Sequence, residues 1–431
     1  MRHGIGSVAV IFVLGVAVVS AAAQTSAPAQ QSQEDRIKAL EERIIALEGQ
    51  VRMLKSQQAQ QPALGTSPAT PAVTAAPAAS TPPQATGTPV GGSAEQAGQL
   101  PVYGGASAAA KALNPDISVI GDFLGAMGHN PFSPSPALEM HESEVGFQAI
   151  IDPYARGDFF LSFGEEGVNL EEGYITFTAL PAGLVLRGGK MRAAFGKVNT
   201  LHNHVLPWTD RPLVTNSLVG GEDGINDAGL SLTRILPAPK GLFLEATGQV
   251  FRGDSDEVFK SSRRSDVSTV AHLRGYRDVS ESTNVDIGVS YARGHNELGN
   301  GLLTQLYGVD ATLRWKPLRR AIYHSFVGRS EFIWSQRQQL PRLQRSFGFY
   351  TSGDYQLGRR WFVGGRYDRS DRARDNALTD SGGSLVLTYW PSEFSQIRGQ
   401  YRLTRYAERF DAHELLLQLQ FSLGAHGAHP F

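Results

Sequence analysis

The chain of 431 residues contains no cysteine, so it can form neither disulfide bonds nor thiolate metal sites. Its formal net charge is only -1, and this balance gives it no bulk attraction for nucleic acid. The motifs G-x-S-x-G and H-E-x-x-H and the P-loop are missing too, and no spacing of Ser, His and Asp indicates a catalytic triad. We therefore expect a protein that is not an enzyme and that needs no cofactor.

Long hydrophobic runs are also absent, apart from a short one near the start. A positively charged beginning precedes the apolar stretch 8–19, and three alanines follow it. This order is typical of a secretory signal, whereas a membrane anchor needs about 20 apolar residues. We predict a cleaved signal peptide over 1–23 and a short linker over 24–32, so the mature protein is expected to be exported.

A heptad pattern follows over 33–56 and predicts a coiled coil. Arg36 and Arg43 take g positions, with Glu41 and Glu48 at e, which suits ion pairs between parallel chains. β-branched residues at a with Leu at d favour a dimer, and a larger assembly could impose a trimer. The alternative is an amphipathic helix packed against its own protein. The expected coiled-coil contacts are Ile37, Leu40, Ile44, Leu47, Val51 and Leu54.

The segment 57–114 consists mainly of Pro, Ala, Thr, Ser, Gly and Gln, with hardly a bulky apolar residue. Such a composition cannot bury enough surface to offset the entropy of ordering the chain. We therefore predict a disordered linker here.

Short segments of alternating apolar and polar residues fill 115–424. The segment 412–424 is the clearest, with Leu417 and Leu419 on one face and Gln418 on the other. This period of two predicts half-exposed strands. Sixteen strands are expected, near 116–127, 138–151, 155–164, 169–179, 184–195, 227–236, 242–252, 266–278, 283–294, 305–316, 322–335, 346–356, 361–370, 382–390, 395–406 and 412–424. These strands predict an all-β fold, and their even number suits a 16-stranded antiparallel transmembrane β-barrel.

The links between these segments alternate between short turns, such as 317–321, and mostly longer polar links, such as 253–265 and 336–345. Short turns of outer-membrane barrels lie in the periplasm. Both ends of the barrel, the coiled-coil helix and a tail over 425–431 are then expected on that side. The alternative is a soluble β-sandwich or solenoid, but a sandwich should show fewer strands with an apolar face opposite a charged one.

The link 196–226 is far longer than the others, and a long connection in a compact chain is usually functional. We expect it to fold into the barrel mouth and constrict the pore. Just before it, 188–197 reads GGKMRAAFGK. Together with the signal, the coiled coil and the sixteen-strand pattern, this stretch resembles the G-[KQ]-x-x-x-x-F-G strand end of outer-membrane porins, nearest the phosphate-selective type. The resemblance covers about 115–431 and implies a trimer.

Two features depart from that family. The loop contributes only Lys197, in a chain poor in lysine, which argues against phosphate specificity. The chain also continues past its last strand through 425–431, whereas porins usually end in the strand on an aromatic residue.

Fixed charges are expected to line the pore, because strand parity and the loop place them toward the lumen. Arginines on the later strands would face an acidic loop and create a field that orders polar solutes by their dipoles. The alternative is that the charges only solvate the lumen and pair with one another. The candidate pore-lining residues are Lys197, Asp210, Arg211, Glu222, Asp223, Arg314, Arg329, Arg366, Arg398 and Arg402.

Two histidine pairs are weak metal candidates, His202 with His204 and His426 with His429. Two histidines make only half of a site, and the sequence indicates no third ligand. Weak surface binding or a hydrogen bond within the loop is the preferred interpretation, so no metal is expected.

The predicted function is a porin of the bacterial outer membrane, a passive channel for small hydrophilic solutes or ions, anions among them. The alternative is a non-conducting barrel that tethers the envelope through its coiled coil. The expected partners are outer-membrane lipid, further copies of the chain, small polar solutes, and peptidoglycan or a periplasmic protein, but no nucleic acid.

Overall fold

The structure is a computed structural model that describes residues 115–424 except 165–166, 256–257 and 300. The expected signal peptide (1–23), the coiled coil (33–56) with the linkers on either side of it, and the tail (425–431) lie outside the described residues. These expectations therefore stay predictions.

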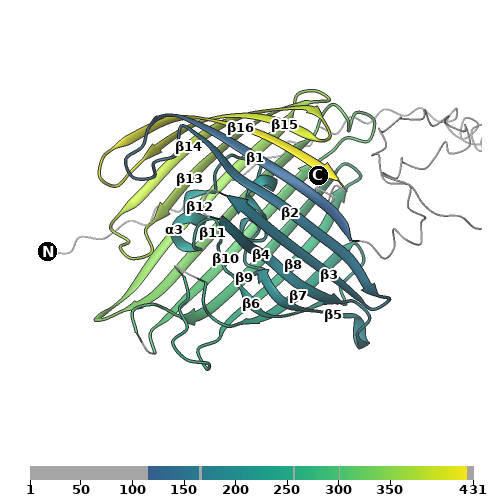
Figure 1. Ribbon diagram of the computed structural model, residues 1–431, viewed down its shortest axis with the longest axis vertical. Coiled ribbons are helices and arrows are strands. Elements are labelled where there is room, and N and C mark those ends of the chain that lie inside the picture. Colours follow the sequence, from purple (N-terminus) through teal and green to yellow (C-terminus); the bar gives the residue numbers. More distant parts are fainter. Residues whose placement is uncertain (1–114, 165–166, 256–257, 300, 425–431) are drawn as a thin grey trace, which may run out of the picture. The chain divides into compact units, whose positions relative to one another are not determined.

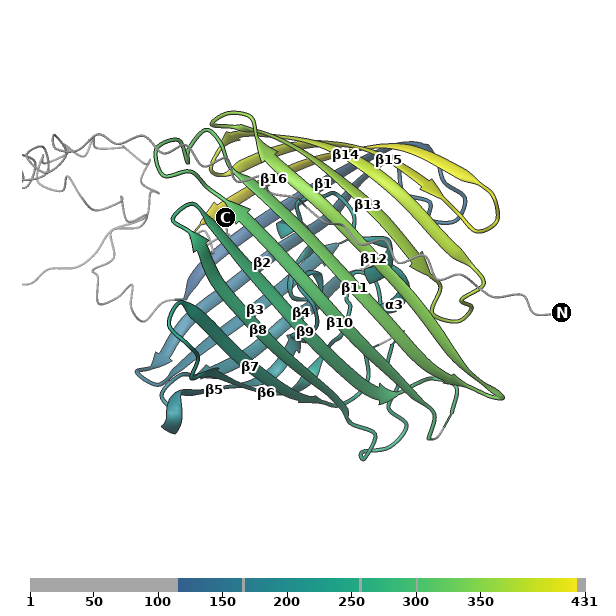
Figure 2. The same ribbon diagram turned by 180° about the vertical axis from the view of Figure 1, so that it is seen from behind.

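Sixteen antiparallel strands of the described residues form one closed barrel, in which every strand pairs with its neighbours in the chain (Figures 1 and 2). The strands are β1 (Asp116–His129), β2 (Leu138–Asp152), β3 (Ala155–Gly164), β4 (Gly167–Phe177), β5 (Leu184–Arg192), β6 (Asn226–Leu236), β7 (Leu242–Phe251), β8 (Ser268–Ser280), β9 (Thr283–His295), β10 (Leu303–Trp315), β11 (Phe326–Gln339), β12 (Arg342–Gln356), β13 (Trp361–Asp371), β14 (Thr379–Ser392), β15 (Ser395–Arg405) and β16 (Asp411–Gly424). The sequence-based prediction of a 16-stranded antiparallel barrel is confirmed.

The barrel wall has an apolar outer face and a polar inner face. On β16, Leu417 is 45% exposed while its neighbour Gln418 is 1% exposed. Successive side chains of a strand point to opposite faces, so the alternating sequence produces this division directly. The inner polar side chains are buried because the narrow lumen brings them against one another and against the loop between β5 and β6.

The barrel closes where β1 pairs with β16, from Ser118 opposite Gly424 to His129 opposite His413. Gly121 lies at this seam, and a Cβ atom there would come within 2.3 Å of the Phe421 ring. A glycine at this position therefore lets the ring lie across β1. Closure leaves no unpaired strand edge on either side.

The links show where the predicted boundaries were wrong. The predicted loop 336–345 is mostly strand, because β11 and β12 stay paired as far as Gln339 and Arg342, so that Leu340 and Pro341 form the turn. The predicted short turn 317–321 widens to 316–325. The segment 336–345 combines polar residues with a proline, a composition typical of loops. Two antiparallel strands can nevertheless stay paired there, because backbone hydrogen bonds do not require an apolar face.

Helices are few. The link before β5 contains η1 (Pro181–Gly183), and the long loop contains η2 (Val198–Thr200), η3 (Asn203–Val205) and α3 (Leu213–Leu218). No helix in the described part of the chain is long and apolar enough to cross a membrane, a finding that concerns helices alone.

Candidate functional site

The loop 193–225 leaves β5 and returns at β6 after contacting the inner wall of the barrel. The backbone N–H of Gly196 donates to Ser290 Oγ on β9 at 2.9 Å, and that of Lys197 donates to Glu331 Oε1 on β11 at 2.7 Å. Helix α3 packs against β11–β14 (Figure 2). Polar side chains of the wall thus satisfy backbone groups of the loop that would otherwise be buried without partners.

Asn199 holds the two ends of the loop together. Its side-chain amide donates to the carbonyl oxygens of Ala193 and Ile225 at 2.9 and 3.1 Å, and its Oδ1 accepts the Ile225 N–H at 2.8 Å. Gly224 follows a left-handed backbone (φ 61°), and a Cβ atom there would come within 2.0 Å of Asn199 Oδ1. Glycine therefore allows the clamp to close.

An apolar core fills the space between the loop and the wall. Its largest member is Trp208, which is fully buried. The indole contacts Tyr350 of β12 edge-on, with ring centroids 5.2 Å apart. The guanidinium of Arg366 on β13 lies 4.8 Å from the centroid of the Trp208 ring. Since this core is built by loop side chains, the loop is a packed part of the fold.

Asp210 joins the loop to three side chains of the wall. Its Oδ2 pairs with Arg366 and with Arg402 of β15, each at 2.9 Å, and its Oδ1 accepts a hydrogen bond from Gln400 at 2.5 Å. Burial alone would raise the pKa of Asp210, but the two arginines outweigh it and lower the pKa to about 2. The carboxylate is therefore ionised at neutral pH and fixes the loop electrostatically.

Arg398 of β15, another predicted pore-lining arginine near the loop, also forms hydrogen bonds. It donates to the carbonyl oxygen of Trp208 at 3.0 Å and to Gln418 Oε1 at 2.7 Å. Arg366 and Arg398 are both buried. The acidic loop and the arginine wall of the sequence-based hypothesis thus meet at Asp210, as direct ion pairs.

The other predicted loop charges lie elsewhere. Arg211 donates to Asn203 and to the carbonyl oxygens of Val198 and Leu201, all within the loop, at 2.6–3.1 Å. The Glu222 side chain is 64% exposed and lies 3.4 Å from His141 Nε2. Asp223 contributes its carbonyl oxygen, which accepts from Arg192 at 3.0 Å. Arg211 therefore shapes the loop, and Glu222 and Asp223 are its exposed acidic residues.

A second charged group lies on β8–β10 and at the start of the loop. Asp286 of β9 is 2.7 Å from Arg274, 3.7 Å from Lys197 and 3.9 Å from Arg314. Burial lowers the pKa of Lys197, although Asp286 opposes this effect. The cationic side chains here keep about a third of their surface exposed, so their charges remain accessible from the lumen.

A cavity of about 470 Å³ adjoins the loop on the side of the short links. Arg329 of β11, paired with Asp354 at 2.5 Å, borders it. Its charged lining residues are Arg314, Lys316, Arg329, Arg359, Arg398 and Asp354, together with the imidazole of His204. Cations outnumber anions among these residues, so the lining carries a net positive charge.

The histidines of the loop meet an acidic cluster on the wall. His202 Nδ1 lies 2.6 Å from Glu144 Oε2 and 3.0 Å from Glu171 Oε2, and its Nε2 lies 2.8 Å from Glu172 Oε2. Burial alone would lower the pKa of His202, but hydrogen bonds to these carboxylates raise it well above its usual value. Burial lowers the pKa of His204, whose Nδ1 is 3.6 Å from Glu144.

Sequence reasoning missed Glu171 and Glu172 because adjacent strand residues normally face opposite sides. A register shift opposite Phe160 and Leu161 pairs Phe160 with Glu172 and Leu161 with Leu170, which leaves Glu171 as the extra residue of a β-bulge. Both glutamates are buried on the inner face as a result. Two adjacent acids within an alternating strand were the available signal.

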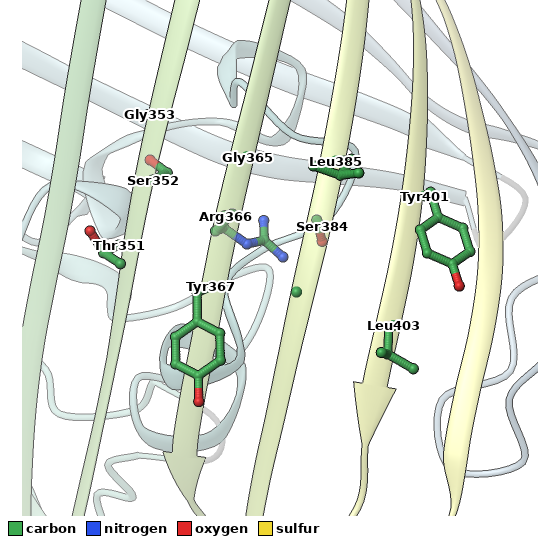
Figure 3. Close-up of a pocket in the computed structure, with 11 residues that line it drawn as sticks. Thr351, Ser352, Gly353, Gly365, Arg366, Tyr367, Ser384, Leu385, Tyr401 and Leu403 are labelled. Carbon is green, nitrogen blue, oxygen red and sulfur yellow. The ribbon is translucent and has the colours of Figure 1, made fainter.

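A second hollow, about 600 Å³, lies on the outer wall over β12–β15 (Figure 3). Gly353, Gly365 and Gly383 leave the strands bare there, and Tyr367 and Tyr401 border it. Both tyrosines belong to the exposed outer face. Arg366, whose guanidinium pairs with Asp210 in the lumen, also lines this hollow.

Comparisons with known proteins support the barrel. No family model matches the chain. An uncharacterized protein of Aquifex aeolicus (strain VF5) is 26% identical in an alignment of length 386, and the match covers 74% of this chain and 81% of that protein. An anion-selective porin from Comamonas acidovorans has a TM-score of 0.51 at 10% identity and covers 72% of this chain and 99% of its own. A loop-deletion mutant of OmpT, an outer membrane protein of Vibrio cholerae, has a TM-score of 0.51 at 9% identity with the same coverage.

The trimer form of OmpT from Vibrio cholerae has a TM-score of 0.50 at 8% identity, and covers 72% of this chain and 99% of its own. At such low identities the likenesses show the fold alone, which is the fold of outer-membrane porins.

Proposed function

We propose that this protein is a passive channel of a bacterial outer membrane for small hydrophilic solutes, with a preference for anions. The apolar outer face supports the membrane setting, since it is exposed all round the barrel and a lipid core would cover it. The strands have 9 to 15 residues, and a tilted strand needs about 9–11 to cross the apolar slab.

The constriction is assigned to the loop 193–225. It narrows the lumen where Trp208 and Asp210 contact the wall of β12–β15. The buried ion pairs hold the loop in one position, so the open cross-section stays constant. Solutes would pass the part of the lumen that borders Lys197, Arg314 and Arg329, whose charges remain partly exposed.

The observation that carries the anion preference is the cavity beside the loop, where five cationic side chains face one carboxylate. A ring of Arg and Lys favours anions in a pore because it lowers their electrostatic energy on entry. Phosphate enters this proposal only as one anion among others, since Lys197 is the one lysine that the loop supplies.

For orientation, we place the short links and both barrel ends in the periplasm, following the asymmetry of bacterial barrels. The predicted coiled coil would lie there as well. We further propose a homotrimer, as in the trimer form of OmpT that shares this fold. Light scattering of the full mature chain in detergent should give three copies per particle.

Planar-bilayer recording of the purified mature chain tests the channel. We expect stepwise openings and, in a potassium chloride gradient, a reversal potential of the sign that chloride permeation produces. A second gradient with potassium phosphate compares the two anions. Absence of openings would contradict the channel and favour the tether, whose coiled coil (33–56) should then retain peptidoglycan in a pull-down. A cation-type reversal potential would contradict the anion preference alone.

A further inference from the structure

Four buried carboxylates gather where the loop crosses β2 and β4. Glu142 and Glu144 come from β2, and Glu171 and Glu172 from the bulge of β4. In the described part of the chain, Arg192 is the one arginine or lysine paired with them, 3.5 Å from Glu171. The carboxyl groups therefore outnumber the fixed positive charges in a buried place, which is unfavourable unless protons or a further cation neutralise the excess.

Glu142 shows the imbalance most directly. The residue is only 6% exposed, and no nitrogen or hydroxyl donor of the described residues bonds to its carboxyl oxygens, which face the carboxyl group of Glu171. One oxygen lies within 4.8 Å of oxygens of both Glu144 and Glu171. Three carboxyl groups this close and this buried must be neutralised, and a cation between them would do so.

The loop adds nitrogen donors to this oxygen cluster. Glu144, His202 and His204 each place one ligand atom within 4.8 Å of the others. His202 Nδ1 faces Glu144, and on the other side of the ring Nε2 lies 2.8 Å from Glu172 Oε2. A histidine that binds a metal through one nitrogen and donates from the other to a carboxylate is the usual support of a metal site.

We propose that Glu144, His202 and His204, completed by a carboxylate oxygen of Glu171 or Glu142, bind one divalent transition-metal ion such as zinc. Mixed imidazole and carboxylate ligands favour Zn²⁺ and its first-row neighbours over Mg²⁺ and Ca²⁺, which prefer oxygen alone. The ion would tie the loop to β2 and β4, in addition to its ion pairs with β13 and β15.

Binding requires a small local adjustment. Ligand atoms about 2.0–2.1 Å from a tetrahedral zinc ion are separated by about 3.3 Å. Glu144 Oε2 and His204 Nδ1 are 3.6 Å apart and fit this spacing, whereas His202 Nδ1 and Glu144 Oε2 are 2.6 Å apart, a hydrogen-bond distance. The ion therefore replaces the proton between His202 and Glu144, and the two side chains separate by less than about 1 Å.

Calorimetry of the full mature chain, stripped with EDTA and free of any histidine tag, tests the site with zinc chloride. We expect one saturable equivalent. The variants Glu144→Gln and His204→Gln should weaken binding at least about tenfold, as expected for loss of a ligand, while His272→Gln on another part of the inner wall should not. His426 and His429 are removed together as a further control, and the equivalent should persist in that variant.

Cobalt substitution provides a readout on the wild-type chain, independent of whether a variant folds. Visible absorption bands typical of tetrahedral Co²⁺ with nitrogen and oxygen ligands are expected, and zinc should displace them. The proposal is overturned if the wild type shows no saturable zinc binding, if Glu144→Gln binds unchanged while remaining heat-modifiable on a gel, or if magnesium binds as tightly as zinc.

Discussion

One guanidinium, that of Arg366, holds Asp210 twice. It contacts the carboxylate Oδ2 and the backbone oxygen of Asp210, both at 2.9 Å, although the two residues are 156 positions apart in the chain. Asp210 lies in the loop and Arg366 on the far wall. This contact therefore fixes where the loop crosses the lumen, and the predictions below start from it.

Replacing Asp210 by Asn should destabilise the barrel by roughly 3 kcal/mol, because it leaves two largely buried arginines without their shared anion. Urea unfolding in detergent measures the change. Glu408→Gln is the matched control, since Glu408 pairs with Arg372 at the surface and such pairs contribute little. Equal stability of the two variants would contradict a structural role for the Asp210 cluster.

The contribution of Asp210 should also depend on pH. Its pKa in the folded protein is about 2, below the ordinary 3.8. A lowered folded pKa means that the carboxylate stabilises the fold above about pH 4 and that this stabilisation, about 2 kcal/mol, is lost as the pH falls toward 2. The stability difference between wild type and Asp210→Asn should therefore be full at pH 6 and shrink by pH 2.5. A constant difference would exclude this linkage.

Anion preference should depend on Arg314 and Arg329, whose guanidinium groups are partly exposed, more than on the buried Arg398. The double variant Arg314→Gln, Arg329→Gln should move the reversal potential toward cation permeation while the chain still folds. The double variant Arg374→Gln, Arg405→Gln, at two exposed positions, serves as the control with the same charge change. An unchanged reversal potential in the first double variant would place the selective charges elsewhere.

Trp208→Ala should destabilise the protein by about 3–5 kcal/mol and release the loop, because the indole fills the space between loop and wall. Single-channel recordings should show larger and noisier openings. Trp361→Ala removes an exposed indole at a strand end and should leave the conductance as in the wild type. Unaltered openings in Trp208→Ala would mean that the loop does not constrict the pore.

Leu417→Arg tests whether lipid covers the outer face. Leu417 is exposed in the middle of β16, so arginine there would be harmless in water but should cost about 2–4 kcal/mol near the centre of a bilayer. Folding titrations into lipid vesicles measure the difference. Leu357→Arg, exposed in the link between β12 and β13, should fold like the wild type. Normal folding of both variants would argue against a membrane-spanning wall.

The strands were predictable because their signal is local. Any residue pair such as Leu417 and Gln418 reports the face of its strand without knowledge of its neighbours. The predicted strand ends were wrong around Pro341. Polar residues and a proline are typical of a loop, but here the strands continue because each pairs with the other. The inward positions of Arg314, Arg329, Arg366, Arg398 and Arg402 also followed from parity.

The partners of these side chains could not be predicted in the same way. Sequence parity indicates that Asp210 and Arg366 approach the lumen, but their contact requires the loop to fold inward. The bulge that turns Glu171 inward depends on a register shift against β3. The carboxylates that would join His202 and His204 as further metal ligands depend on both the bulge and the position of the loop, so the sequence alone could not indicate them.

By itself, the sequence determined the number of strands, their apolar and polar faces and the position of the long loop, because each depends on the two-residue period of a strand or on chain length. The tertiary structure alone decided which charges pair, which stay exposed and where histidines meet carboxylates. Those outcomes depend on distances between residues far apart in the chain, which barrel closure and loop packing set.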